Sequence, residues 1–506
     1  MGFGIVELAL VVVTIYLLYK AFNPYGFWKK LGVPDVVPDI PLIGNISMML
    51  EAPNVFANKA YKTYPNERFY GVYTLWRPTL IVKDPDLVES ILIKDFSHLY
   101  NRNNTSDIET NALSKHLVNY HDDKWKALRN KLTPTFSTGK LKGMHPQLVT
   151  CAESFVKYLG KFDRKDCVEV KDLCGRFSMD VIASCAFGLD LDIMNNPQSE
   201  FYKIGRSSFM PSYFLKIFFL LQPFLASVYK KLGMGMIPKS MMDFFVNAVD
   251  ETLAYREKNN VQRPDFLHLL TELKKKDDDL VKKKELDPND PVVFDHHSLV
   301  SNAFVFFAAG YETTATTLSY LLYELALNQD KQQILYDDIT NVLEKHKGEY
   351  SFEAIAEMSY LEQAVSETLR MHSPAAAIDR KVTKDYQIPG TEIVVPAGVT
   401  VIVPTYGIHH DPQYFPEPEK FKPERFDPEK NDIAKGTFLP FGAGPRICIA
   451  ARFARYEIKT CAALLLKTYK FHPCEKTQIP MEYDSRSFLL IAKNGVTLSL
   501  ERRSTA

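Results

Sequence analysis

The order of hydrophobic and polar positions along the chain predicts a mainly α-helical protein with small β-sheets. The longest helical pattern extends from about Asp295 to Asp330, and a strongly apolar stretch lies between Phe201 and Ser240. Short runs rich in β-branched and aromatic residues, from Phe69 to Leu75 and from Thr79 to Lys83, are bounded by turn residues. These two runs predict a small sheet near the N-terminus.

Polar residues and turn signals assign two further segments. Runs of Lys and Asp from Lys274 to Pro291 predict a solvated loop. In the tail, alternating residues from Ser485 to Ile491 and from Val496 to Glu501 flank Asn494-Gly495. This arrangement predicts a β-hairpin with Asn494-Gly495 as its turn.

The N-terminal residues 1–22 are almost entirely apolar, and they are long enough for a helix to cross a bilayer. Basic residues follow this run, which by the positive-inside rule places the next domain in the cytosol. A cleaved signal peptide is the alternative, but it would need a basic segment before a shorter apolar core. We therefore expect a membrane anchor at 1–22, a proline-rich linker at 23–45 and the main domain at 46–506.

Charge and cysteine usage narrow the class of protein. The chain carries 61 basic and 61 acidic residues, so no global basic excess indicates a nucleic-acid partner. Its seven cysteines include no close pairs, which predicts neither a disulfide framework nor a zinc site. The odd count leaves one cysteine for a dedicated role, and we expect the other six to pack in the interior: Cys151, Cys167, Cys174, Cys185, Cys461 and Cys474.

The candidate chemistry centres on the run from Phe441 to Ala450, a glycine-rich loop that contains Cys448. Small residues let the backbone pass close to a large flat cofactor, and Arg446 can meet an anionic edge of that cofactor. Helix-forming residues follow from Ile449 to Leu465, so Cys448 lies near a helix N-terminus, where amide dipoles favour a thiolate. Cys448 is therefore a candidate metal ligand, with packing as a buried hydrophobe as the alternative.

The centre of the long predicted helix reads Ala309-Gly310-Tyr311-Glu312-Thr313-Thr314. Gly and adjacent β-branched residues are poor helix formers, so this stretch predicts a local break. A freed carbonyl could then bond a Thr hydroxyl or a water. As the alternative, Thr313 bonds back within an intact helix.

Two pairs of residues have helical spacing. Trp125 and Arg129 are four positions apart, so both project from one helix face. Glu367 and Arg370 are three positions apart in the helix predicted around Tyr360 to Met371. Taken alone, each pair is a common surface pattern.

Together these motifs closely resemble the signatures of the cytochrome P-450 haem-thiolate monooxygenases. The haem-binding signature of that family reads Phe, two residues, Gly, one residue, Arg, one residue, Cys, one residue, then Gly or Ala. The Ala-Gly-x-Glu-Thr-Thr, Glu-x-x-Arg and Trp-x-x-x-Arg motifs also match, as does Pro423-Glu424-Arg425-Phe426. The resemblance covers essentially the whole chain and is greatest to the animal microsomal group that includes the drug-metabolising 3A enzymes.

The resemblance implies the cytochrome P-450 fold, in which haem b is buried between the long helix and the Cys loop, with Cys448 bound to the iron. The break at Ala309 and Gly310 would hold O2, and Glu312 and Thr313 would supply protons. Ser373 to Ile378 would form a strand of the substrate pocket. Glu367, Arg370 and Arg425 would form a structural clamp behind the haem. The residues expected to bind haem, besides Cys448, are Arg102, Trp125, Arg129, Arg380, Phe441, Gly444, Arg446 and Ala450.

The implied function is insertion of one oxygen atom from O2 into an apolar substrate such as a steroid, fatty acid or xenobiotic. NADPH-cytochrome P-450 reductase would deliver the electrons at the endoplasmic reticulum membrane, with cytochrome b5 as a further partner. The catalytic domain would face the cytosol. Two alternatives stay open: a haem-thiolate isomerase or dehydratase that acts on a preformed peroxide, and a non-catalytic haem sensor or carrier.

Ala450 departs from the Gly that many relatives carry two residues after the ligand. Gly is required there only if φ is positive or if the haem leaves no room for a methyl group. The residues from Ala451 to Arg455 form helix readily. We therefore expect Ala450 to belong to that helix and to be accommodated.

Overall fold

The computed structural model describes residues 4, 11–16, 23–36, 44–45, 49–103, 113–207, 211–231, 237–288, 290, 292–430 and 432–503. The described α-helices are α2 (Phe27–Lys30), α4 (Pro53–Lys62), α5 (Pro85–Glu89), α6 (Asp122–Leu132), α7 (Thr138–Leu159), α8 (Val170–Ile182), α9 (Glu200–Ser207), α10 (Tyr213–Lys231), α11 (Lys239–Asn259), α12 (Phe266–Lys282), α13 (His296–Leu327), α14 (Gln329–Lys345), α15 (Phe352–Glu357), α16 (Ser359–Met371), α17 (Thr405–His409) and α18 (Ala451–Thr468). The strands are β1 (Phe69–Thr74), β2 (Arg77–Val82), β3 (Val168–Glu169), β4 (Ile378–Lys381), β5 (Tyr386–Gln387), β6 (Val394–Val395), β7 (Thr400–Val403), β8 (Tyr469–Pro473) and β9 (Thr497–Arg502).

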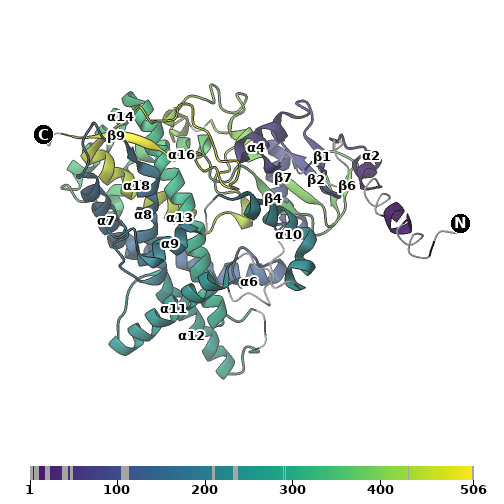
Figure 1. The fold of residues 1–506 in the computed structure, drawn as a ribbon, viewed down its shortest axis with the longest axis horizontal. Coiled ribbons are helices and arrows are strands. Elements are labelled where there is room, and N and C mark those ends of the chain that lie inside the picture. Colours follow the sequence, from purple (N-terminus) through teal and green to yellow (C-terminus); the bar gives the residue numbers. More distant parts are fainter. Residues whose placement is uncertain are drawn as a thin grey trace.

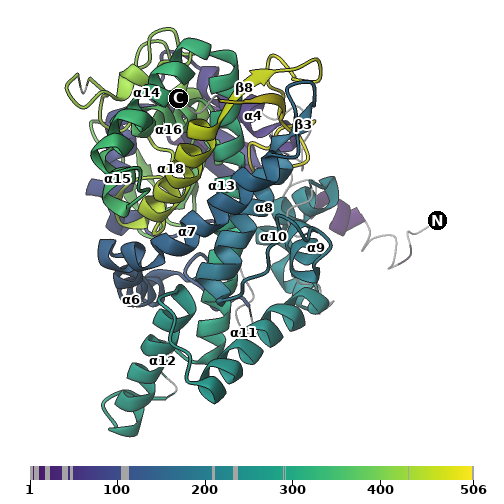
Figure 2. The ribbon, with the colours of Figure 1, turned by 90° about the vertical axis from the view of Figure 1, so that its left-hand side faces the viewer.

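The long helix α13 is the element around which the helical side of the molecule packs (Figure 1). It contacts α8, α12, α14, α16 and α18 directly, and Figure 2 shows α8 and α18 beside it. Most of its 32 residues are buried, which explains the lack of a polar face in its sequence. The predicted helix from Asp295 to Asp330 is therefore confirmed.

A four-stranded sheet in the order β1-β2-β7-β4 lies on the other side of the molecule, next to α4 (Figure 1). Its antiparallel β1–β2 pair matches the two strands predicted near the N-terminus. The other two strands, β7 and β4, lie about 300 residues later in the sequence, and β7 pairs with β2 in parallel. The strand predicted at Ser373 to Ile378 is displaced, because β4 begins only at Ile378.

The charged run from Lys274 to Pro291 was predicted to be a loop, and that prediction is wrong for Lys274 to Lys282, which belong to α12, whereas residues 283–288 are non-helical as predicted. α12 continues through Lys282 because its charges pair along the helix, as in the Lys274–Asp278 ion pair at 2.6 Å. Asp277 points inward, where it pairs with Lys131 and accepts a hydrogen bond from Phe294 N at 2.7 Å. A run of charged residues in the sequence therefore does not show that one of its carboxylates, Asp277, is buried.

The predicted tail hairpin is also wrong. Gly495 does adopt the positive φ of a turn residue, at +71°. The strand after this turn, β9, pairs with β8 and β3 instead of with Ser485 to Ile491. Two partners for β9 satisfy both of its backbone edges, which a lone hairpin would leave half unpaired.

The predicted anchor at 1–22 lies mostly outside the described residues. Within the described part of the chain, none of the helices combines the length and the apolar character needed to cross a bilayer. The described part of the predicted linker packs on the sheet, because Trp28 is fully buried and its Nε1 donates to Val72 O at 3.0 Å. Asp35 also forms a bridge with Gly71 of β1.

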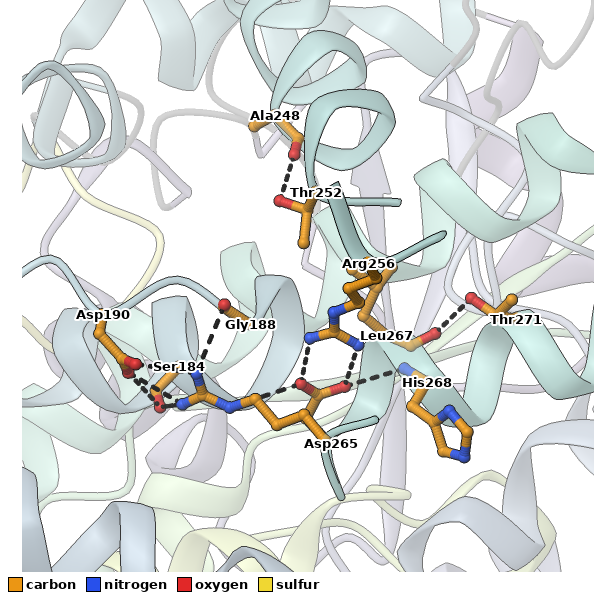
Figure 3. Close-up of polar contacts among 11 residues, drawn as sticks. Ser184, Gly188, Asp190, Ala248, Thr252, Arg256, Asp265, Leu267, His268 and Thr271 are labelled. Carbon is orange, nitrogen blue, oxygen red and sulfur yellow. Dashed lines mark hydrogen bonds and ion pairs between the residues drawn. The ribbon is translucent and has the colours of Figure 1, made fainter. Parts of the chain in front are cut away.

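A cluster of ion pairs around the buried Asp265 ties the connection between α11 and α12 to the segment that follows α8 (Figure 3). Arg256 donates to both oxygens of the fully buried Asp265, and Arg263 donates to both oxygens of Asp190 at 2.9 Å. Asp265 also caps α12 by accepting from His268 N at 2.9 Å. This cluster fixes the lower helices in Figure 1 to the core that supports α13.

Candidate functional site

Cys448 lies in a turn immediately before α18. Its backbone N–H donates to Phe441 O at 2.9 Å, which closes the loop on itself. Burial raises the pKa of the Cys448 thiol, whereas the N–H of Ala450 and the charges of Arg102 and Arg129 lower it. The net effect is a raised pKa, so the free thiol keeps its proton, and a thiolate is favoured only where a metal replaces that proton.

Gly444 is the glycine that this loop requires. Its φ is +70°, and a Cβ at this position would lie 1.8 Å from Leu92 O. Leu92 belongs to η2, a π-helical turn from Ser90 to Lys94. The loop thus packs directly on another backbone segment, and a side chain at 444 would force the two apart.

Ala450 is not inside the following helix, contrary to the prediction. It is the N-cap of α18, with a φ of −95° and a ψ of 12°. Because this φ is negative, Ala fits without backbone strain. An N-cap favours Gly over Ala, however, so the stability advantage expected for Ala in a helix does not apply here.

Four arginine side chains gather beside the Cys loop: Arg102, Arg129, Arg380 and Arg446. Burial, together with the charges of Arg102 and Arg380, lowers the pKa of Arg446 to about 9. Burial and Arg102 likewise lower the pKa of Arg380 to about 10. Asp379 offsets this repulsion only in part, so the cluster favours a ligand with more than one negative charge.

The protein itself already uses most of Arg446. Its guanidinium donates to Tyr100 O at 2.8 Å and to Tyr120 O at 3.1 Å, and it stacks on the Trp125 ring with its Cζ 4.1 Å from the centroid. Arg380, in contrast, has a buried Nε without a hydrogen-bond partner among the described residues. An unsatisfied guanidinium N–H in a cationic cluster fits the two carboxylates of a haem.

One face of α13 opens toward solvent in the middle of this otherwise buried helix. Ala309 is exposed and Thr313, one turn later, is half-buried, so both lie on the same face. The Thr313 hydroxyl donates to Ala309 O at 2.7 Å. α13 is α-helical throughout, so the predicted break is absent and the alternative, an intact helix with Thr313 bonded back, is what the structure shows.

Gly310 has a packing role on the neighbouring face of α13. A Cβ at this position would lie 2.2 Å from Ile182 Cδ1 of α8. The missing side chain lets α8 approach α13 closely, which accounts for Gly within a helix.

Glu312 lies on the buried side of α13, away from the face that carries Thr313. Its Oε1 forms an ion pair with Lys171 Nζ at 2.7 Å and accepts from Thr316 Oγ1 at 3.2 Å. Both partners of this ion pair are nearly inaccessible, with side chains 13% and 6% exposed. The structure therefore separates the two side chains that the sequence groups as one proton relay.

Glu367, Arg370 and Arg425 meet as the sequence predicts. Arg370 binds Glu367 through two hydrogen bonds of 2.8 and 2.9 Å, and Arg425 Nε donates to Glu367 Oε1 at 3.1 Å. Arg370 also donates to His409 O at 2.8 Å and to Pro418 O at 2.7 Å. The clamp thus fastens α16 to the chain segments that lead to the Cys loop.

Two residues beside the site escaped prediction from sequence. Lys171, at the start of α8, gives no local signal for its pairing with Glu312, because the two residues lie about 140 positions apart. Glu457 of α18 is fully buried, and burial raises its pKa far above the ordinary value. Its position on the apolar side of a helix is the one sequence feature that could have revealed it.

Comparison with known proteins agrees with this geometry. The family model described as Cytochrome P450 matches residues 34–498. The chain is 36% identical to "Probable cytochrome P450 6a14" of Drosophila melanogaster, over 98% of this chain and 99% of that protein. It is 36% identical to "Cytochrome P450 6a2" of the same species, over 97% and 98%, and 34% identical to "Cytochrome P450 6k1" of Blattella germanica, over 99% and 97%. The chain therefore belongs to the cytochrome P450 family and is a haem-dependent monooxygenase.

Proposed function

We propose that this enzyme inserts one oxygen atom of O2 into an apolar organic substrate, with haem b held by Cys448. The observation that carries the proposal is the partly buried Cys448 beside four guanidinium groups and the exposed face of α13. When bound, haem supplies the redox-active iron at which O2 is reduced. Cys448 would hold the iron through an anionic sulfur, the type of ligand that donates electron density to haem iron.

The arginine cluster binds the haem carboxylates in this proposal. Arg380 Nε has no other partner among the described residues, and Arg102 and Arg129 lie close enough to Cys448 to lower its pKa. Arg446 positions the Trp125 ring by stacking on it. Pairing with carboxylates would also relieve the mutual repulsion of the arginines.

Thr313 and Glu312 take separate parts in proton supply. Thr313 Oγ1 stands on the open face of α13, where it can hold a water or donate its proton. Glu312 can approach that face only after its Oε1 leaves Lys171 Nζ. We therefore propose that Thr313 delivers the proton and that Glu312 supplies protons to Thr313 from the buried side of α13.

The helix α10 is our candidate for a roof over the substrate site. Its exposed apolar side chains include Tyr213, Phe214 and Ile217, of which Phe214 is 67% exposed. Lys216 holds this helix down by donating to Glu51 O and Ser485 O, both at 2.7 Å. An exposed apolar surface on such a helix suits entry of lipophilic substrates and contact with the endoplasmic reticulum membrane.

NADPH-cytochrome P-450 reductase, with cytochrome b5 as a second donor, is the proposed electron source. Lys124, Lys126 and Arg452 are exposed near the Cys loop and can form a basic docking face. Arg455 contributes less, because it forms an ion pair with Glu362 at 2.5 Å. We propose that the N-terminal residues anchor this arrangement to the membrane.

The test is spectroscopic. The reduced carbon monoxide complex of the haem-loaded protein should show the Soret position typical of a thiolate ligand, and Cys448→Ser should abolish it. Thr313→Ala should keep the thiolate spectrum and release more peroxide per NADPH consumed with reductase. A thiolate spectrum that survives Cys448→Ser would mean that another residue binds the iron.

A further inference from the structure

The helix α10 (Figure 1) is attached to the rest of the molecule mainly through polar contacts. Within the described part of the chain, it packs extensively against no other helix or strand. None of its described side chains belongs to a hydrophobic core cluster, whereas α8, α13 and α18 each contribute many. A helix without core side chains can separate from its neighbours at a low cost in buried apolar surface.

Lys216 makes the main polar contact between α10 and its surroundings. This lysine is only 2% exposed, although its neighbour Phe214 faces solvent. Its Nζ donates to Glu51 O, just before α4, and to Ser485 O, both at 2.7 Å. Burial lowers the pKa of the Lys216 ammonium to about 8, so most of it is charged at neutral pH. Both hydrogen bonds are therefore charge-assisted.

Tyr213 provides a second contact one helical turn earlier. A hydrogen bond of 2.7 Å joins its hydroxyl to Ser485 Oγ. Because Tyr213 and Lys216 are three positions apart, both side chains leave the same face of α10 and reach the same residue. Tyr213 is 49% exposed and neutral, so its contact should contribute less than that of Lys216.

Ser485 belongs to the C-terminal loop between β8 and β9, and this loop is fixed to the core. The Tyr483 hydroxyl lies 2.6 Å from His372 Nδ1, and His372 Nε2 lies 2.8 Å from Glu324 Oε1 near the end of α13. The fully buried Leu490 donates its N–H to Pro374 O at 2.9 Å. The loop is therefore part of the rigid core, and α10 is the partner that can move away from it.

We propose that Lys216 is a latch that holds α10 closed over the haem site and sets the rate at which bulky molecules enter and leave. This role rests on the proposed function, in which α10 is the roof of the substrate site. In the closed state, Lys216 Nζ binds the carbonyls of Glu51 and Ser485. In the open state, α10 has moved away and water solvates the ammonium and both carbonyls.

The latch has a kinetic signature that a general disturbance of the site lacks. The same two hydrogen bonds break before a bulky molecule enters and before it leaves, and they form again in both closed states. Loss of the latch should therefore raise the association and dissociation rates by the same factor and leave Kd unchanged. Small molecules, which need less opening, should be affected much less.

The experiment uses the full-length, haem-loaded protein in detergent. The probes are imidazole and clotrimazole, which bind haem iron through the same type of nitrogen but differ greatly in bulk, and stopped-flow mixing follows the Soret band. Lys216→Met keeps the apolar stem and removes the ammonium. We expect it to raise both rate constants for clotrimazole by about tenfold or more, the effect of losing one hydrogen bond from a charged group, at an unchanged Kd. The rate constants for imidazole should change by less than about threefold, and Tyr213→Phe should have a smaller effect on clotrimazole than Lys216→Met.

Lys231→Met is the matched control, because Lys231 is an exposed lysine on the same helix. It should leave both clotrimazole rate constants unchanged. A second measurement needs neither haem nor a variant at position 216: in the unmodified chain, an acetylating ester should modify Lys216 at least about ten times more slowly than Lys231, and Tyr213→Phe should accelerate modification of Lys216.

Unchanged clotrimazole rates in Lys216→Met would overturn the proposed latch, as would an equal acceleration of imidazole or acetylation of Lys216 as fast as that of Lys231. These measurements need neither O2 nor NADPH. A failure of the latch therefore appears in the binding and acetylation rates, whereas a failure of the proposed function appears in the carbon monoxide spectrum and the peroxide yield.

Discussion

Glu457 offers a sharp test, because it is a carboxyl group buried behind the Cys loop. It lies on α18, nine residues after Cys448, and hydrogen bonds to Ser178 of α8. Ser178 in turn donates to Gly310 O of α13 at 3.4 Å. Glu457 Oε1 has no partner among the described residues, as expected for the carbonyl oxygen of a protonated acid whose other oxygen carries the hydrogen.

The pH dependence of stability follows from this protonation. Burial raises the folded-state pKa of Glu457 well above its ordinary value of 4.5. The folded chain therefore holds a proton that the unfolded chain releases, so this group stabilises the fold fully below the unfolded pKa and loses that contribution as pH rises toward the folded pKa. Each pH unit between the unfolded and the folded pKa removes about 1.4 kcal/mol of the stability that Glu457 contributes.

The perturbation is Glu457→Gln, which keeps the shape but cannot ionise. We expect the difference in unfolding free energy between the variant and the unmodified chain to change by about 1.4 kcal/mol per pH unit between the unfolded and the folded pKa, in favour of the variant at high pH. Urea unfolding followed by far-ultraviolet circular dichroism measures it, and Glu344→Gln on the exposed face of α14 is the control. Equal pH slopes for the Glu457 variant and the unmodified chain would refute the reasoning.

Three further outcomes test the site. Lys171→Met should destabilise the fold by about 3–5 kcal/mol in urea unfolding, because it leaves Glu312 buried without a cation. Adding Glu312→Leu should restore most of the loss. A Lys171→Met variant as stable as the unmodified chain would contradict this. Arg370→Met should cost about 3–5 kcal/mol, whereas Arg425→Met, at the more exposed end of the clamp, should cost about 1.5–3 kcal/mol, and equal losses would count against the assigned geometry. Ala450→Gly should leave haem content and Tm nearly unchanged, since the N-cap preference for Gly opposes its larger unfolded-state entropy; a rise in haem content would show that Ala450 impairs the site.

The sequence could predict those parts of the site that depend on local spacing. Cys448, Gly444 and Arg446 lie within one loop, and the Glu367–Arg370 spacing needs only a helix to bring the side chains together. The long helix and the first two strands were predictable for the same reason, because hydrophobic periodicity is local. Predictions that relied on charge or a turn signal were wrong for α12 and for the tail, where the deciding partners come from distant segments.

The placement of Glu312 shows why adjacency in sequence does not predict a shared role. Glu312 and Thr313 are neighbours, but on a helix consecutive side chains point about 100° apart. Thr313 therefore faces the open side of α13, whereas Glu312 enters the interface with α8 and meets Lys171. Helical periodicity can assign the two residues to different faces of α13. It cannot predict that Lys171 lies opposite one of those faces, because Lys171 comes from a distant part of the chain.

The same distinction governs the arginine cluster, and it determines what holds the cofactor. Each arginine is unremarkable in its own segment, and repulsion arises only where the fold brings Arg102, Arg380 and Arg446 together. The protein partly satisfies Arg446 through backbone carbonyls and Trp125, but it leaves Arg380 Nε without a partner among the described residues. The folded chain thus retains repulsion among buried arginines that a ligand with two negative charges would neutralise. Haem binding should therefore stabilise the fold as well as supply the chemistry.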